Sequence, residues 1–509
     1  MSVFMKNDIT NICWAKAPKE KRGRDQLGIQ NCSIVVYGIQ LPGLTNLTNH
    51  IRYYGLYCWL IGILSQDKEK TDKYQYNYIR RAELVIALLM RDKGIKGVVG
   101  SDYVKKGKCP VVNNSTYDIA AGADYENKET YWKYRTGAFG QYYLGSLLTL
   151  GLVSYDDNTF NETDRGRKLA KRFADSVGET ACGNFLSVIE SGRLSEEDIV
   201  ELQVFCLNNI LVNSSEWNFY KEILIDYDSI YSGTNAYNRR NTLRLLIEFL
   251  QENESNNVVN DFVAKMFNEQ PSDNSKTEFG WYYYYLIETI HYCLETLFWK
   301  FLKGIERKSG IIVAAEYLNE YVESIVKQMK KTGREYFCDI VADNRLGVVD
   351  IVKDRCFLDK MIQNGMSDEK INEASAIAIK LLCATFNEYL SRKDLIVNYE
   401  KELSLCRQFG NASRLLDICV QKNFTLSLQE ALSKIIRRIM KEHTLSSYRK
   451  IGNSSASSLK YVIEEGCFIH VETVFPQFTS PRLYSLKNFM EDLSLVSDNK
   501  LTNLGMKIF

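Results

Sequence analysis

Arg438-Ile-Met-Lys-Glu-His443 is the one spacing in the sequence that is typical of a catalytic pair. A guanidinium can stabilise the negative charge that develops on a phosphate, and an imidazole can give or take the proton that such a reaction needs. Arg437 offers a second register, and so short a pattern arises easily by chance in a chain of 509 residues. The pair is therefore a candidate site that needs support from other observations.

This spacing resembles the RxxxxH motif of HEPN ribonucleases. The resemblance implies that Arg438 and His443 stabilise and protonate the transition state that leads to a 2′,3′-cyclic phosphate on an RNA backbone. A HEPN-like ribonuclease effector that uses these two residues is therefore one functional alternative.

Other catalytic, metal and cofactor motifs are missing from the sequence. The four histidines are isolated, and there is no HExxH, no CxxC and no Gly-x-Ser-x-Gly pattern. The glycine-containing stretch 94–100 lacks the GxxxxGK[ST] pattern of a phosphate-binding loop. We therefore expect no metal and no cofactor, and we favour a non-enzymatic protein over an enzyme.

The cysteines and the most hydrophobic run both indicate a cytoplasmic protein. The 13 cysteines are scattered singly, which suits neither a zinc ribbon nor a disulfide scaffold and is typical of a reducing compartment. Residues 281–302 are the most apolar stretch, but they contain Glu288, Glu295 and Lys300. We therefore expect a buried core helix there and no membrane span.

Positive charge is a local feature of this chain. The formal net charge is only +1, so no global electrostatic signature of a nucleic-acid-binding protein exists. A plain solvated surface charge is the alternative for each local cation. The candidate nucleic-acid contacts are Lys16, Lys19, Lys21, Arg22 and Arg24 of a basic N-terminal arm, together with Arg80, Arg81, Lys133, Arg135, Arg482 and Lys487.

Two stretches share one order of helix, strand, turn, strand and helix start. In 148–170, Gly151 ends a helix, Asp156, Asp157 and Asn158 favour a turn, and Thr163 suits the N-cap of the next helix. The segment 492–509 repeats this order more weakly, with its cap at Thr502. This order predicts two winged-helix-like modules, which often bind DNA through the helix before the wing. The alternative is an ordinary corner of a larger fold, and 129–150, the helix expected before the first wing, carries few basic residues.

The composition predicts a mainly α, multi-domain protein with few short strands. Only 6 prolines occur in 509 residues, and hydrophobic residues make up 45% of the chain. We expect a strand at 32–39, where β-branched residues gather, and another at 467–474. The expected domains are 1–42 (a basic arm and a strand), 43–178 (a helical domain with the first winged-helix-like module), 179–425 (a helical domain) and 426–509 (the second module).

Residues 43–60, 79–89, 139–153 and 480–505 resemble segments of uncharacterised bacterial proteins of antiphage defence islands, which occur beside helicases or ATPases. The resemblance implies a role in antiviral defence or DNA surveillance and implies no catalytic residue. We therefore expect a DNA-contacting or scaffolding subunit of a bacterial defence complex, with a helicase or ATPase as its protein partner. A purely protein-binding adaptor is the remaining alternative, because many winged helices contact only protein.

Overall fold

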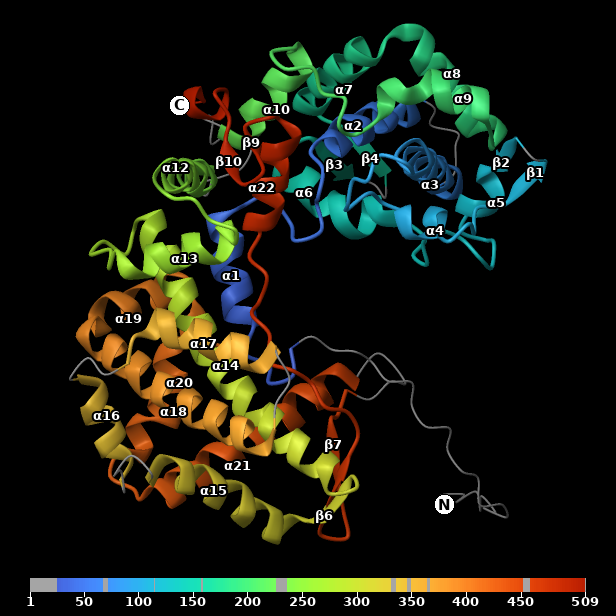
Figure 1. Cartoon of the computed structure of the whole chain (residues 1–509). Helices are drawn as coiled ribbons and strands as arrows, with labels where there is room; N and C mark the ends of the chain where they lie inside the picture. Colours follow the sequence, from blue (N-terminus) through green and yellow to red (C-terminus); the bar gives the residue numbers. More distant parts are fainter. Residues whose placement is uncertain are drawn as a thin grey trace, which may run out of the picture. The chain divides into compact units, whose positions relative to one another are not determined.

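The computed structural model describes residues 25–66, 72–113, 115–156, 159–225, 236–330, 336–345, 349–363, 367–451 and 458–508. These residues form mainly helices, with a few short antiparallel strands (Figure 1). The mainly α class expected from the composition is therefore confirmed.

The chain divides into two compact units, and each is built from segments that are distant in sequence. Unit 1 comprises residues 1–33 and 286–479, and unit 2 comprises residues 34–285 and 480–509. Helices α1 (Asn31–Gln40) and α14 (Thr277–Arg307) contribute residues to both units. The four domains expected from the sequence, with boundaries after residues 42, 178 and 425, remain a prediction.

Unit 2 is organised around α2, a helix that is buried along almost its whole length. Tyr53, Tyr54 and Tyr57 are fully buried, and α2 packs against α7. The helices of this unit are α2 (Arg52–Ser65), α3 (Asp72–Leu89), α4 (Ser101–Lys105), α5 (Ile119–Ala123), α6 (Leu144–Thr149), α7 (Asp164–Val177), α8 (Glu179–Ser191), α9 (Glu196–Glu201), α10 (Ser215–Ile225), α12 (Ala236–Glu252), α13 (Val258–Asn268) and α22 (Leu483–Asp492).

Two hairpins of unit 2 lie within the two segments, 148–170 and 492–509, for which the sequence predicts strand, turn and strand. Strands β3 (Val153–Asp156) and β4 (Thr159–Glu162) pair antiparallel, as do β9 (Val496–Ser497) and β10 (Lys500–Leu501). The Thr163 side chain accepts a hydrogen bond from the Gly166 amide and caps α7, as expected. A third sheet in this unit has the order β1 (Val111–Asn113), β2 (Thr116–Asp118) and β5 (Arg193–Ser195).

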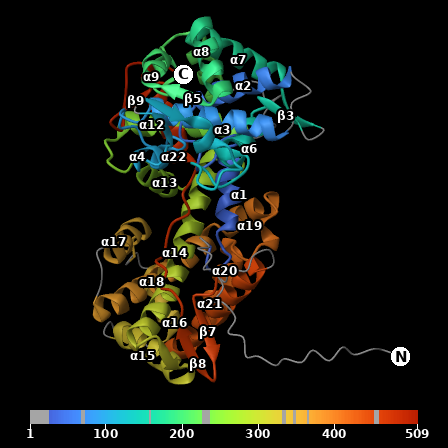
Figure 2. The same cartoon turned by 90° about the vertical axis from the view of Figure 1, so that its right-hand side faces the viewer.

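Unit 1 is a helical assembly with one small sheet. Helix α18 (Asp368–Ser391) packs against α15 (Ala314–Lys330), α16 (Phe337–Arg345) and α17 (Ile351–Gln363), and α15 also packs against α21 (Leu428–Ile451) (Figure 2). The remaining helices are α19 (Lys393–Glu402) and α20 (Ala412–Cys419). Strands β6 (Ile311–Val313), β8 (Cys467–His470) and β7 (Tyr461–Glu464) pair antiparallel in that order.

Two expectations about local structure were wrong. The segment expected to be a strand at 32–39 is helix α1, which buries Cys32, Val36 and Tyr37 on one side. Val36 lies four residues after Cys32, and Tyr37 lies four residues after buried Ser33, so helical packing outweighs the β propensity of the Ile-Val-Val run. The helix expected over 129–150 begins later, with a π-helical turn at Phe139–Tyr143 that continues into α6.

Candidate functional site

Helix α21 presents one polar, basic face to a pocket in unit 1. The neighbouring side of the helix is apolar, because Leu432, Ile435, Ile436 and Ile439 recur at helical spacing and are buried. The same periodicity gathers the side chains that line the pocket, which are Arg438, Lys441, Glu442, Leu445, Ser446, Arg449 and Lys450.

The opposite wall is formed by two segments far from α21 in the sequence. One contains Arg407, Gln408, Phe409 and Gly410 before α20, and the other is the stretch 25–32 at the start of α1. The two segments touch closely, since a Cβ atom placed on Gly410 would lie 2.1 Å from the carbonyl oxygen of Ile29. A glycine at position 410 is therefore needed for the two walls to meet.

A capping residue fixes the position of Arg414 at the same wall. The Asn411 side chain accepts a hydrogen bond of 2.8 Å from the Arg414 amide and caps α20. The Asn411 amide group also donates to the carbonyl oxygens of Leu405 and Gln408, at 2.9 and 2.7 Å. Asn411 thus ties the loop 405–410 to the first turn of α20, and Arg414 extends from that turn.

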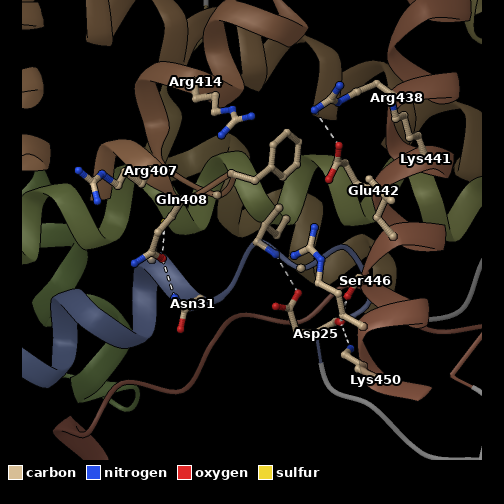
Figure 3. A pocket seen from close by; sticks show the side chains of 17 residues that line it. Asp25, Asn31, Arg407, Gln408, Arg414, Arg438, Lys441, Glu442, Ser446 and Lys450 are labelled. Carbon is tan, nitrogen blue, oxygen red and sulfur yellow. Dashed lines mark hydrogen bonds and ion pairs between the residues drawn. The ribbon is translucent and has the colours of Figure 1, made fainter. Parts of the chain in front are cut away.

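The pocket has a volume of about 600 Å³ and contains many more positive than negative groups (Figure 3). Asp25 and Glu442 are its two carboxylates. The Asp25 carboxylate accepts hydrogen bonds from the amides of Ile29 and Gln30, at 3.0 and 3.3 Å. The pocket is also lined by six cations, which are Arg407, Arg414, Arg438, Lys441, Arg449 and Lys450.

Only part of this positive charge is neutralised within the pocket. Arg438 Nη2 lies 2.7 Å from Glu442 Oε1, four residues along α21, and Lys450 donates to the backbone carbonyl of Asp25. Among the described residues, no carboxylate forms an ion pair with any of the other four cations, which are Arg407, Arg414, Lys441 and Arg449. Cations brought together without counter-charges repel one another, so the pocket is suited to an anionic ligand.

An aromatic ring lies among these cations. The guanidinium carbons of Arg414 and Arg438 lie 5.4 and 4.8 Å from the centre of the Phe409 ring. Figure 3 shows both guanidinium groups pointing from the upper helices toward the middle of the pocket. The pocket therefore combines a flat apolar group with planar hydrogen-bond donors.

His443 lies on α21 next to this face but does not line the pocket. Its residue exposure is 0%, its Nδ1 donates to the Gln26 carbonyl at 2.9 Å, and its Nε2 accepts from the Lys460 amide at 3.0 Å. Both ring nitrogens are thus engaged with backbone groups. Burial lowers the pKa of His443 to about 4, which keeps the imidazole neutral near pH 7.

The cations predicted from the sequence as nucleic-acid contacts are placed elsewhere. Lys16, Lys19, Lys21, Arg22 and Arg24 lie outside the described residues. The other six belong to unit 2.

Arg80 and Arg81 are held by neighbouring groups of unit 2. Arg80 is 0% exposed and donates to the carbonyls of Ala123 and Trp132, at 2.5 and 2.9 Å. Arg81 forms a two-pronged ion pair with Asp124, at 2.8 and 2.7 Å. These two side chains stabilise the loop that follows α5.

The other four cations of this group differ in exposure. Lys133 and Arg135 are exposed, and Arg135 lies over the Tyr76 ring at 5.0 Å. Arg482 donates to the Leu41 carbonyl at 3.0 Å, and burial lowers its pKa. Lys487 pairs with Glu491 at 2.5 Å.

Sequence reasoning missed most of the pocket. Of its six cations, the sequence indicates only Arg438 as a candidate, because of its spacing from His443 along the chain. The periodic signal of Lys441 and Arg449 on one face of α21 was readable in the sequence. No sequence signal places Arg407 or Arg414 beside that face, because the loop before α20 reaches it only through tertiary packing.

Comparisons with protein-family models, with curated proteins and with solved structures gave no match to this chain. In the described part of the chain, no group of three or more His, Cys, Asp or Glu side chains is arranged to hold a metal ion. Within the same residues, no helix has both the length and the apolar character to cross a membrane.

Proposed function

We propose that the protein binds nucleic acid and that the unit 1 pocket holds the sugar–phosphate backbone of a single strand. The observation that carries this proposal is the set of four cations without carboxylate partners, Arg407, Arg414, Lys441 and Arg449, around one concave site. Contact with DNA is one of the roles expected from the sequence, beside a protein partner, although the residues proposed here are different ones.

Phosphate chemistry suits this set of side chains. Three of the four cations are arginines, whose planar donors match two phosphate oxygens at once, and the lysine adds a point charge. Each phosphate that is neutralised releases condensed counterions into solution, which favours binding at low salt. A ligand with several linked phosphates therefore gains more from this pocket than a single carboxylate would.

The aromatic ring in the pocket favours a single strand over a duplex as the ligand. Proteins that bind single strands combine a positively charged groove with aromatic side chains on which bases stack. Phe409 is partly exposed within the pocket and supplies such a ring. A base of a single strand can turn toward this ring, whereas the bases of an intact duplex face each other.

The test is binding of the purified protein to labelled strands of one sequence, as single-stranded DNA, single-stranded RNA and duplex DNA. The pocket variant is Lys441→Ala with Arg449→Ala. The control variant is Lys434→Ala with Arg437→Ala, which removes the same charge from exposed positions of α21 outside the pocket lining. Weaker binding of a single strand by the pocket variant alone supports the proposal. Equal loss in both variants, or no binding by the wild-type protein, contradicts it.

The same assay separates the other functions considered above. Cleavage of the RNA that disappears in His443→Ala favours the HEPN-like ribonuclease alternative. A protein that binds none of the strands and co-purifies with a partner favours the adaptor.

We also propose that the two helix–hairpin segments of unit 2 act as winged-helix-like modules. The hairpins β3–β4 and β9–β10, each preceded by a helix, support this interpretation. Exposed Lys133 and Arg135 lie before the first of these helices and are the candidate contacts there. Loss of duplex binding in Lys133→Ala with Arg135→Ala, in a protein whose unit 1 pocket is intact, tests this role.

Membership of a bacterial antiphage defence complex, with a helicase or ATPase partner, rests on the sequence resemblance alone. It stays a prediction, and a pull-down of the tagged protein from cells challenged with phage tests it.

A further inference from the structure

A second pocket of unit 1 contains a buried lysine. The pocket has a volume of about 190 Å³ and is lined by residues of α14, α15 and α18. Lys300 of α14 lines this pocket with only 8% of its surface exposed. Its Nζ donates to Ser324 Oγ at 2.9 Å and lies 4.8 Å from the centre of the Tyr321 ring.

The other two lysines that line the pocket are in a different situation. Lys303 Nζ lies 2.7 Å from Glu306, and Lys308 Nζ lies 2.9 Å from Glu320. Both are partly exposed, and both keep a carboxylate next to the ammonium group. Among the described residues, no carboxylate forms an ion pair with Lys300, whose polar neighbour is a neutral hydroxyl.

This environment favours the uncharged amine of Lys300. Burial removes water from the ammonium group and lowers the pKa of Lys300 to about 8; the charge of Glu320 opposes this shift and that of Arg307 adds to it. A neutral amine carries the lone pair that a nucleophile needs, and buried lysines with lowered pKa values serve as nucleophiles toward carbonyl groups.

We propose that Lys300 is a nucleophilic amine that forms an imine with a small aldehyde or ketone bound in this second pocket. The volume is below the roughly 300–1,000 Å³ of sites for drug-sized ligands, so the substrate is a small molecule. Tyr317 and Tyr321 also line the pocket and supply flat apolar surface for it. This proposal is independent of nucleic-acid binding at the basic pocket.

The reaction balances without a further reactant. The lone pair of Lys300 Nζ forms a bond to the carbonyl carbon, and the π electrons of the C=O bond move to oxygen. The carbinolamine then loses that oxygen as water, together with the two hydrogens of the amine, and a C=N bond remains. Ser324 Oγ holds Nζ in the pocket before the attack and, by accepting its N–H, orients the lone pair away from itself.

The test is reductive labelling of the whole protein with benzaldehyde and cyanoborohydride, followed by peptide mass spectrometry. Hydride reduces the imine to a stable secondary amine and so records which lysine reacted. At pH 8 we expect Lys300 to be labelled about tenfold faster than Lys303 and Lys308, because about half of its amine is uncharged at that pH, whereas a carboxylate lies next to each of the other two ammonium groups. Lys303 and Lys308 are internal controls, because they line the same pocket and occur in the same digest.

The pH dependence of labelling is a second readout. The charged and titratable groups around Lys300 are Lys303 and Arg307 of α14, Lys308 just after it, Tyr317, Glu320 and Tyr321 of α15, and Asp368 of α18. Glu320 raises the pKa of Lys300, so Glu320→Gln is expected to move half-maximal labelling to lower pH. Glu323→Gln, an exposed position of the same helix, is expected to leave it unchanged.

Labelling of Lys300 at the rate of its two neighbours, or with their pH dependence, overturns the proposal. Because these measurements use the wild-type protein and a surface variant, they do not depend on folding of a Lys300 variant. Lys300→Arg is expected to lose the fast-labelled peptide while strand binding at the basic pocket is unchanged.

Discussion

The Lys460 amide donates a hydrogen bond of 3.0 Å to Nε2 of His443, which joins helix α21 to the residue that precedes strand β7. The other ring nitrogen donates to the Gln26 carbonyl, and the ring packs 4.6 Å from Phe298. The imidazole therefore connects three segments of unit 1 in its neutral form. This role explains a histidine in the middle of a basic helix without assigning it to catalysis.

Neutral His443 makes the stability of the protein depend on pH. Its pKa is about 4 in the folded protein and near 6.5 in the unfolded chain, so the unfolded chain binds the proton first. The stabilisation is complete above pH 6.5 and is lost as the pH falls from 6.5 to 4, by up to about 3 kcal/mol. Urea unfolding at a series of pH values measures this. His443→Gln is expected to flatten the curve in that window, and an unchanged slope contradicts the assignment.

A buried ion pair in unit 2 is expected to be the most sensitive charged contact of that unit. Arg52 Nε lies 3.0 Å from Glu216 Oε1, and both side chains are almost fully buried. Glu216→Gln leaves the guanidinium buried without a counter-charge, which typically costs about 3–5 kcal/mol. Glu222→Gln on the same helix is the control, because Glu222 is exposed and its partner Arg172 is 3.9 Å away, and surface pairs contribute about 0–1 kcal/mol. Similar midpoints of thermal unfolding for the two variants would argue against a structural role of the pair.

Local sequence signals predicted local structure well. The cap predicted at Thr163 is present, and so are a capping box at Ser195 and an apolar stripe on α21, because each depends on residues within one or two turns. The segment 32–39 is a helix and not the expected strand, because the packing of Val36 and Tyr37 outweighs the β propensity of their neighbours. Pairing of β6 with β8 joins residues about 150 positions apart, which no local pattern encodes.

The candidate site illustrates the same limit. A short motif indicates Arg438 in the sequence, but in the structure Arg438 contacts Glu442 and the Phe409 ring. His443 instead forms hydrogen bonds with the backbone of Gln26 and Lys460. One wall of the pocket comes from α21, whose basic face follows from periodicity. The other wall comes from the segment 25–32 and from the stretch with Arg407 and Arg414, which can approach Ile29 because position 410 is a glycine.

Gly410 is therefore expected to be essential for the shape of the pocket. In Gly410→Ala the new Cβ would lie 2.1 Å from the Ile29 carbonyl, so the loop 405–410 and the segment 25–32 must separate. We expect a loss of stability of about 1–3 kcal/mol from this backbone shift, with weaker binding of single strands. Gly183→Ala is the control, since its Cβ meets nothing within 4 Å on an exposed helix face and should stabilise by roughly 0.5–1 kcal/mol. Equal effects of the two variants would show that the walls do not need to touch.

The salt dependence of binding gives the number of cations that the pocket offers to a strand. If all four unpaired cations contact phosphates, the logarithm of the binding constant falls with the logarithm of the salt concentration with a slope of about −2.8. Removal of Lys441 and Arg449 should reduce the slope by about 1.4, whereas removal of Lys434 and Arg437 should leave it unchanged. A slope that falls equally in both variants means that charge acts from the whole surface of α21, and the pocket then has no special role. A slope near zero in the wild-type protein means that phosphates are not what the pocket binds.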